Sequence, residues 1–114
     1  NVMKPLFIAL LPQLLSENTI IEGIHAFTVR YVVGDDVALA EHADDSIATI
    51  NVCLGGDFSG GDLEFYPIQN GKRETVRVKQ QIGIALLHSG ALRHRALPIT
   101  GTVGAEVVVV VVVV

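Results

Sequence analysis

The chain has 114 residues, and because single hydrophobic cores typically span about 100–150 residues, it holds one domain at most. Its 12 acidic side chains outnumber its 8 lysines and arginines, and the net charge of −4 argues against a nucleic-acid partner. Cys53 is the single cysteine, which excludes an internal disulfide and favours an intracellular, cytoplasmic location. The valine run at 107–114 is far shorter than the ~20 residues of a membrane span, so no membrane association is expected.

The first 24 residues have the pattern of a flanking segment. Residues 2–15 are apolar, but Pro5 and Pro12 limit any helix there to short pieces. The sequence predicts a short helical or irregular element over residues 1–24 that packs against or covers the domain. The domain itself is predicted over residues 25–114.

Alternating side chains from His25 onward predict the first strand. In the run HAFTVRYVV, Phe27, Val29 and Tyr31 lie on one face, and Arg30 lies on the other. Gly34-Asp35-Asp36 follows and provides a turn. A strand over residues 25–33 is therefore expected.

A second long strand is predicted from Ile47 to Leu54, and one of its faces is polar. Thr49, Asn51 and Cys53 share that face, while aliphatic side chains share the opposite one. A face with a hydroxyl and an amide is too polar for a dry core. We therefore expect it to line a pocket.

Turn signals recur through the rest of the chain. Gly60-Gly61, Asn70-Gly71 and Gly83 each precede a short β-rich run. The eight valines at 107–114 predict a final apolar strand, which would promote aggregation if it stayed unpaired. Since no helix-length amphipathic pattern interrupts these signals, the pattern predicts an all-β sandwich or barrel.

Two polar side chains lie two residues apart between the predicted strands. His42 and Asp44 leave the same face of an extended backbone, so they can bind one divalent ion, although a solvated strand end fits the same triplet. A third ligand would complete the two-histidine, one-carboxylate triad of non-haem Fe(II) sites. By spacing, either His88 or His94 can supply it. For each of these histidines alone, a turn or surface position is the simpler interpretation.

Several ordered blocks of the chain together resemble one enzyme family. The blocks are FTVRY, HADDS, TINVCL, FSGGDLEF, GIALLHSGALRH and LPITGT, and they span residues 26–103. In this order they are similar to the catalytic domain of Fe(II)/2-oxoglutarate-dependent dioxygenases of the prolyl and lysyl hydroxylase type. The resemblance implies a double-stranded β-helix, which is a jelly-roll-like and cupin-like all-β fold.

The resemblance also implies roles for individual residues. Carried over position by position, it makes His42, Asp44 and His94 the metal ligands and the catalytic centre, and it leaves His88 outside the triad. Tyr31 matches a strand tyrosine that faces the co-substrate, and Asn51 matches an asparagine of the pocket wall. The implied cofactors are Fe(II) and the co-substrate 2-oxoglutarate, with ascorbate as a further candidate. Zinc and other divalent ions are expected to compete for such ligands.

One position departs from the family pattern. Beyond the distal histidine and a glycine, the family places an Arg or Lys that pairs with the far carboxylate of 2-oxoglutarate, and this sequence has Val103 there. An aliphatic side chain cannot make that charge-assisted contact. Arg77, Lys79 or Arg95 would have to replace it, although a solvated charged edge is the simpler interpretation of these three.

The implied reaction is hydroxylation of a substrate C–H bond coupled to decarboxylation of 2-oxoglutarate. The closest patterns belong to enzymes that act on prolyl or lysyl side chains of proteins, so a protein or a small molecule is the expected substrate, and residues 70–74 form a candidate loop for selecting it. Two alternatives stay open. Val103 favours a catalytically degenerate protein that serves as a structural or binding component of an assembly. A cupin-like metalloprotein would use the same three ligands without 2-oxoglutarate.

Overall fold

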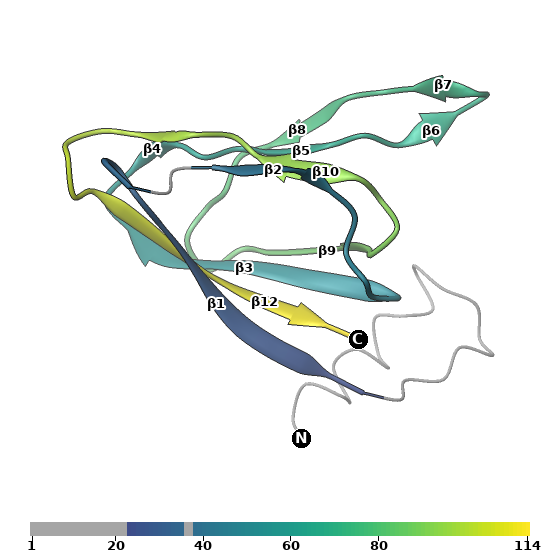
Figure 1. Ribbon diagram of the computed structural model, residues 1–114, viewed down its shortest axis with the longest axis horizontal. Helices are drawn as coiled ribbons and strands as arrows, with labels where there is room; N and C mark the ends of the chain where they lie inside the picture. Colours follow the sequence, from purple (N-terminus) through teal and green to yellow (C-terminus); the bar gives the residue numbers. More distant parts are fainter. Residues whose placement is uncertain (1–22, 36–37) are drawn as a thin grey trace.

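A computed structural model describes residues 23–35 and 38–114 of the chain (Figure 1). Every regular element within those ranges is a β-strand, which confirms the all-β prediction. The segment predicted over residues 1–24 lies outside the described residues, apart from Gly23 and Ile24. The described part of the chain contains no apolar helix of membrane-spanning length.

Eight of the strands form two four-stranded sheets. The larger sheet has the order β1-β12-β3-β9, with β1 at His25–Val32, β3 at Ala48–Gly56, β9 at Ala85–Ser89 and β12 at Glu106–Val113. The smaller sheet has the order β2-β10-β5-β8, with β2 at Leu39–His42, β5 at Leu63–Phe65, β8 at Val76–Val78 and β10 at His94–Ala96. Two short ribbons pair β4 (Ser59–Gly60) with β11 (Ile99–Thr100) and β6 (Ile68–Gln69) with β7 (Lys72–Arg73).

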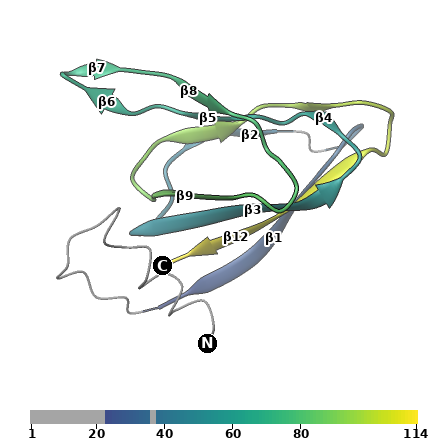
Figure 2. The same cartoon turned by 180° about the vertical axis from the view of Figure 1, so that it is seen from behind.

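The chain passes repeatedly from one sheet to the other. β1, β3, β9 and β12 belong to the larger sheet, while β2, β5 and β10 lie between them in sequence and belong to the smaller one. The two sheets lie face to face in both views of the ribbon (Figures 1 and 2). All the paired strands are antiparallel. This alternating path is that of a double-stranded β-helix, so the predicted fold is confirmed.

The main hydrophobic core lies between the two sheets. The larger sheet contributes Tyr31, Cys53 and Val109, and the smaller sheet contributes Leu63 and Phe65, all of them buried. Because side chains alternate along a strand, each strand that faces this core also presents a second face to the outside. The polar positions among the inward faces are therefore candidates for a site.

The terminal valines form the inner strand β12 of the larger sheet. This strand pairs with β1 from His25↔Val113 to Val32↔Glu106, and on its other side it pairs with β3. Val107 and Val109 pack between the sheets, whereas Val112 packs on the outer face with Ala48 and Ile50. The run is thus paired along both edges, which removes the exposed edge behind the expected aggregation hazard.

Two predicted glycine turns occur where the sequence places them. Asn70 and Gly71 both have positive φ, 52° and 73°, as a tight two-residue hairpin between β6 and β7 requires. In Figure 1 this hairpin extends beyond the two sheets. Gly60 and Gly61 have φ of 70° and 73°, a conformation that favours glycine, and they lead the chain into β5.

Candidate metal centre

His42, Asp44 and His94 converge at one end of the space between the sheets. Each offers one ligand atom, and the three atoms all lie within 4.8 Å of one another. The Asp44 Oδ1 atom is 3.2 Å from His42 Nε2 and 3.5 Å from His94 Nε2. His42 ends β2 and His94 begins β10, and these two residues are direct cross-strand partners. The pairing of β2 with β10 therefore brings together side chains 52 positions apart in sequence.

Backbone carbonyls fix the orientation of both imidazoles of the candidate triad. His42 Nδ1 lies 2.8 Å from the carbonyl oxygen of Ala40, and His94 Nδ1 lies 2.8 Å from that of Leu92. Since a carbonyl oxygen can only accept a hydrogen bond, each Nδ1 carries the hydrogen and donates it. The Nε2 atoms that face Asp44 then present lone pairs when the rings are neutral. This is the arrangement in which a metal-binding histidine is held by a second hydrogen bond.

The carboxylate of Asp44 is held in the same way. Thr49 Oγ1 donates to Asp44 Oδ2 over 2.7 Å, and Ser46 Oγ lies 2.9 Å from Thr49 Oγ1. The backbone N–H of Asp44 donates to the Gly90 carbonyl over 2.8 Å. One carboxylate oxygen is thus occupied by Thr49, and the other is directed at the two histidines.

Removing the Thr49 hydroxyl is expected to weaken metal binding without removing a ligand. Loss of an outer hydrogen-bond partner typically lowers metal affinity about 10–100-fold, so we expect that loss for Thr49→Val in a calorimetric Fe(II) titration under argon. Thr49→Ser keeps the hydroxyl and should retain most of the affinity. Thr28→Val, on an exposed position of β1, is the matched control. Equal affinities for Thr49→Val and the parent would show that this bond does not position Asp44.

Aromatic rings pack around His94 of the candidate triad. Its ring centroid lies 4.3 Å from that of His42, 4.7 Å from that of His88 and 5.7 Å from that of Phe65. His94 is only 8% exposed. The imidazole is therefore confined by its neighbours as well as by its hydrogen bond.

Comparisons with known proteins show the family of the chain. No family model matches the chain. The mouse 2-oxoglutarate and iron-dependent oxygenase domain-containing protein 2 is 37% identical over 82 residues, which cover 69% of this chain and 24% of that protein. The Arabidopsis thaliana protein ICU11, which carries the same domain name, is 34% identical over 104 residues, which cover 84% of this chain and 26% of its own length. The chain belongs to the 2-oxoglutarate and iron-dependent oxygenases.

Solved structures support the fold of this oxygenase domain. A Burkholderia pseudomallei oxidoreductase of the 2OG-Fe(II) oxygenase family matches with a TM-score of 0.58 at 19% identity, covering 78% of this chain and 45% of that one. The non-heme monooxygenase ThoJ, in a nickel complex, matches with a TM-score of 0.53 at 17% identity, covering 77% of this chain and 42% of that one. The chain spans about a quarter of the length of the two curated relatives above.

The donor set of the oxygenase domain fits Fe(II). Two imidazole nitrogens and one carboxylate oxygen on one side of an ion form the facial triad of non-haem iron sites. The candidate triad His42, Asp44 and His94 offers these three donors at the wall of a cavity. All three residues line the same cavity.

The cavity beside the triad also contains the other predicted site residues. It is lined by Tyr31 from β1 and by Thr49 and Asn51 from β3, so the polar face predicted for this strand does face a cavity. Burial raises the pKa of the Tyr31 phenol, which therefore stays protonated at neutral pH. The resemblance sets His88 outside the triad, yet His88 lines the same cavity. In the pairing of β9 with β3, His88 lies directly opposite Thr49, so both side chains are on the face that lines the cavity.

The position expected to carry a cation does not face this cavity. Val103 lies in the turn before β12 and is 82% exposed, so neither its chemistry nor its place fits an anchor for a carboxylate. Arg77 and Arg95 instead lie on the outer face of the smaller sheet, where both bind Glu64, and Lys79 is exposed. None of these four lines the cavity. The described residues therefore fit iron but do not supply the usual partner for the far carboxylate of 2-oxoglutarate.

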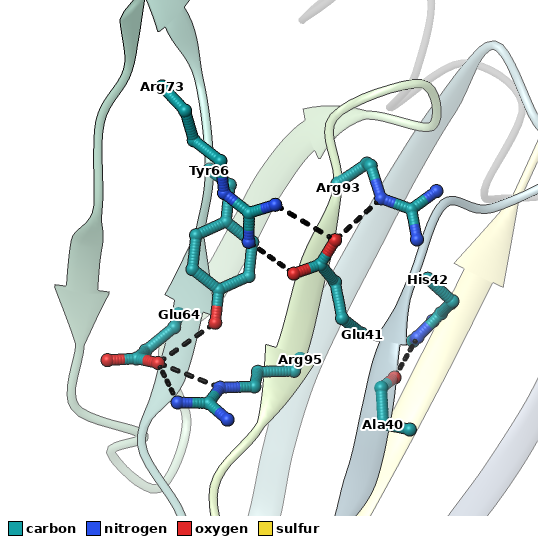
Figure 3. A network of polar contacts seen from close by, with 8 residues as sticks. All are labelled: Ala40, Glu41, His42, Glu64, Tyr66, Arg73, Arg93 and Arg95. Atoms are coloured by element: carbon teal, nitrogen blue, oxygen red, sulfur yellow. Dashed lines mark hydrogen bonds and ion pairs between the residues drawn. The ribbon is translucent and has the colours of Figure 1, made fainter.

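Ion pairs outside the cavity fasten the strands that carry the two histidines of the candidate triad (Figure 3). Glu41 precedes His42, and Arg93 precedes His94. Arg93 Nε donates to Glu41 Oε2 over 2.7 Å, so the two histidines are joined through their neighbours as well. Arg73 from β7 also binds Glu41, and its guanidinium lies 3.9 Å from the ring centroid of Tyr66. These contacts tie the β6–β7 hairpin to the strands of the candidate triad.

A second carboxylate joins three strands of the smaller sheet. Glu64 on β5 is 5% exposed, and it lies directly opposite Arg77 on β8 and Arg95 on β10. It accepts hydrogen bonds from Arg77 over 2.9 Å, from Arg95 over 2.8 Å and from the Tyr66 hydroxyl over 2.9 Å. The hydrogen bonds from Arg77, Arg95 and Tyr66 lower the pKa of Glu64 to about 2. Those from Arg73 and Arg93 lower the pKa of Glu41 to about 2 as well.

These depressed pKa values predict acid sensitivity. The stabilisation by Glu64 is complete above its unfolded pKa of about 4.5 and is lost as the pH falls through the folded value of about 2. We expect the thermal midpoint to fall across that window, and Glu64→Gln to flatten the decline while lowering the midpoint at neutral pH. The measurement is a series of melts from pH 7 to 2. Glu74→Gln, at an exposed position, is the control, and identical acid profiles for Glu64→Gln and the parent would contradict the assignment.

Proposed function

We propose that residues 25–114 form the catalytic domain of an iron-dependent oxygenase that hydroxylates a substrate C–H bond at the expense of a 2-oxo acid. The observation that supports this most is the convergence of three lone-pair donors, His42 Nε2, His94 Nε2 and Asp44 Oδ1, each held from behind by a separate hydrogen bond. A surface cluster of polar groups has no need for three such fixed orientations. The family of the chain agrees with this function.

The roles of the residues follow from their positions. Bound Fe(II) would supply open coordination positions for a bidentate acid and for O2, the chemistry for which the two-histidine, one-carboxylate triad is known. His42, Asp44 and His94 would hold the ion, and Thr49 would keep Asp44 turned toward it. Tyr31 and Asn51 would orient the acid from the cavity wall. The apolar neighbours Phe27 and Val29 would limit water near the reacting atoms.

The net reaction divides one O2 molecule between two products. One oxygen atom enters the 2-oxo acid, which loses CO2 and becomes a carboxylate one carbon shorter, and the other enters the substrate as a hydroxyl. The two electrons released by the decarboxylation and the two from the C–H bond together reduce O2. No external reductant is needed for this balance.

We further propose a lysyl or prolyl side chain of a protein as the substrate. This is supported by a relative from Acanthamoeba polyphaga mimivirus, named procollagen lysyl hydroxylase and glycosyltransferase, which is 36% identical over 80 residues covering 66% of this chain and 8% of that protein. A groove lined by Ile68, Arg73 and Leu92 lies between the β6–β7 hairpin and the turn before β10. A polypeptide could bind in this groove, and the loop at 70–74 belongs to the same hairpin.

A non-catalytic role in an assembly is the second candidate function. It is favoured by one observation, the lack of any Lys or Arg among the described residues that line the cavity. In that case the domain would bind a metal without turning over a 2-oxo acid.

Release of CO2 separates the two candidates. We expect the Fe(II)-loaded protein in air to release 14CO2 from 1-14C-labelled 2-oxo acids, faster when a lysine- or proline-containing peptide is added, and we expect His94→Ala to abolish it. Several 2-oxo acids, with and without a second carboxylate, should be tried. If a folded, iron-loaded sample releases no CO2 from any of them, the non-catalytic function is favoured instead.

A further inference from the structure

The cavity beside the candidate triad is mainly apolar and small. Phe27, Val29, Leu63, Val109 and Val111 line it, together with the few polar groups named above. Its volume is about 70 Å³, room for roughly five water molecules. A ligand with an apolar end matches this lining better than one with two charged ends.

The wall formed by β12 holds no charge in any register. Every residue of this strand after Glu106 is valine, so a shift of the strand by one or two positions would still present valine to the cavity. Glu106 itself is anionic and pairs with Arg30 outside the cavity. The absence of a cation from this wall therefore follows from composition as well as from the observed register.

The other polar groups of the cavity are neutral or already bonded. His88 Nδ1 lies 2.8 Å from the carbonyl oxygen of Ser89 and donates to it, so its Nε2 is an acceptor when the ring is neutral. Thr49 donates to Asp44. Tyr31 and Asn51 contribute uncharged hydrogen-bond donors to the cavity wall.

The arginines of the described chain are all engaged elsewhere. Arg30 binds Glu106, Arg73 and Arg93 bind Glu41, and Arg77 and Arg95 bind Glu64. The two lysines of the described residues, Lys72 and Lys79, are exposed and do not line the cavity. Recruiting any of the arginines would break an ion pair that holds the sheet or the hairpin.

We infer that the acid taken up beside the metal has an uncharged tail, so that this domain prefers a 2-oxo monocarboxylic acid to 2-oxoglutarate. The inference rests on the proposed function, since it names the class of 2-oxo acid that the same site accepts. A second carboxylate would lose its water among valines and gain only the neutral donors Tyr31 and Asn51, whereas an alkyl tail would pack against the same valines. The 2-oxo acid group itself would still bind the metal.

The test compares two acids that differ only at the far end. 2-Oxopentanoate and 2-oxoglutarate have the same five-carbon chain, and the second ends in a carboxylate where the first ends in a methyl group. Each is titrated into the Fe(II)-loaded protein under argon, and the visible charge-transfer band of the iron-bound 2-oxo acid gives the dissociation constant. We expect 2-oxopentanoate to bind at least about tenfold more tightly.

A charge placed in the cavity should reverse this preference. Val111 lies between Phe27 and Asn51 in the sheet register and lines the cavity, so Val111→Lys would supply a cation for the far carboxylate. Val110→Lys, on the opposite face of the same strand, is the matched control. We expect only Val111→Lys to bind 2-oxoglutarate more tightly than the parent protein does.

Each outcome of the parent titration decides something, even if the lysine variants do not fold. Tighter binding of 2-oxopentanoate supports the inference. Equal or tighter binding of 2-oxoglutarate overturns it and leaves the proposed oxygenase function intact. If neither acid produces a band in a folded, iron-loaded sample, both the inference and the proposed function fail.

Discussion

Replacing His94 by alanine is expected to lower the Fe(II) affinity of the protein by more than about 100-fold, beyond the usual effect of losing an outer hydrogen-bond partner. His94 supplies one of three convergent donors, and its 8% exposure means that no mobile surface group easily takes its place. The measurement is an anaerobic Fe(II) titration followed by calorimetry. The thermal midpoint of the His94→Ala protein should also be measured, because a buried imidazole contributes to packing as well.

A second histidine provides the control for this experiment. His25 lies on an exposed position of β1, away from the candidate triad, so His25→Ala should keep the parent affinity. His88→Ala is more demanding, because His88 packs 4.7 Å from His94 between ring centroids without belonging to the three-donor group. The metal affinity of His88→Ala should fall by no more than it falls when an outer hydrogen-bond partner is removed. Loss of binding in His88→Ala and retention in His94→Ala would reverse the assignment.

Gly56→Ala is expected to cause the largest loss of stability among the glycine substitutions of the larger sheet. An added Cβ would stand 1.9 Å from the Glu106 carbonyl oxygen, on the backbone of β12, at a residue with φ of 143°. Strained backbone alone costs about 1–3 kcal/mol, so the clash should bring the loss above about 3 kcal/mol in the free energy of unfolding. Chemical denaturation monitored by circular dichroism measures it.

The neighbouring glycine separates the two contributions. Gly55 has a similar φ of 150°, but an added Cβ there meets nothing within 4 Å. Gly55→Ala should therefore lose only the backbone part, about 1–3 kcal/mol. Equal losses at the two positions would mean that the close approach of β12 to β3 is not the constraint. Both glycines lie beside the register shift between Val108 and Val109, where β3 accommodates an extra residue.

The sequence predicts the strands best where one face is buried and the pattern alternates. The predicted strand at 25–33 agrees with β1 at His25–Val32, and the predicted strand at 47–54 agrees with β3 at Ala48–Gly56. The polar inward pair of Thr49 and Asn51 is visible in the alternation alone, because a period of two fixes which side chains share a face. These are local properties, and local pattern suffices for them.

Other features depend on which strands become neighbours, and alternation says nothing of that. Spacing alone leaves the third ligand open between His88 and His94, and only the pairing of β10 with β2 puts His94 opposite His42. The same holds for Glu64, whose two arginines come from strands on either side of β5. By sequence, Val103 stands at the position where the family has an Arg or Lys, but the turn before β12 directs it outward. The cavity wall formed by β12 lacks a cation because its lining residues are valines.

The most direct test of the account is a crystal structure of the protein grown with Fe(II) under argon, with anomalous scattering recorded at the iron edge. The account predicts a single strong iron peak bonded to His42 Nε2, Asp44 Oδ1 and His94 Nε2, with the remaining positions open to the cavity that Tyr31 and Asn51 line. An iron peak elsewhere, or bonds to His88 in place of His94, would contradict the proposed centre and the function that rests on it.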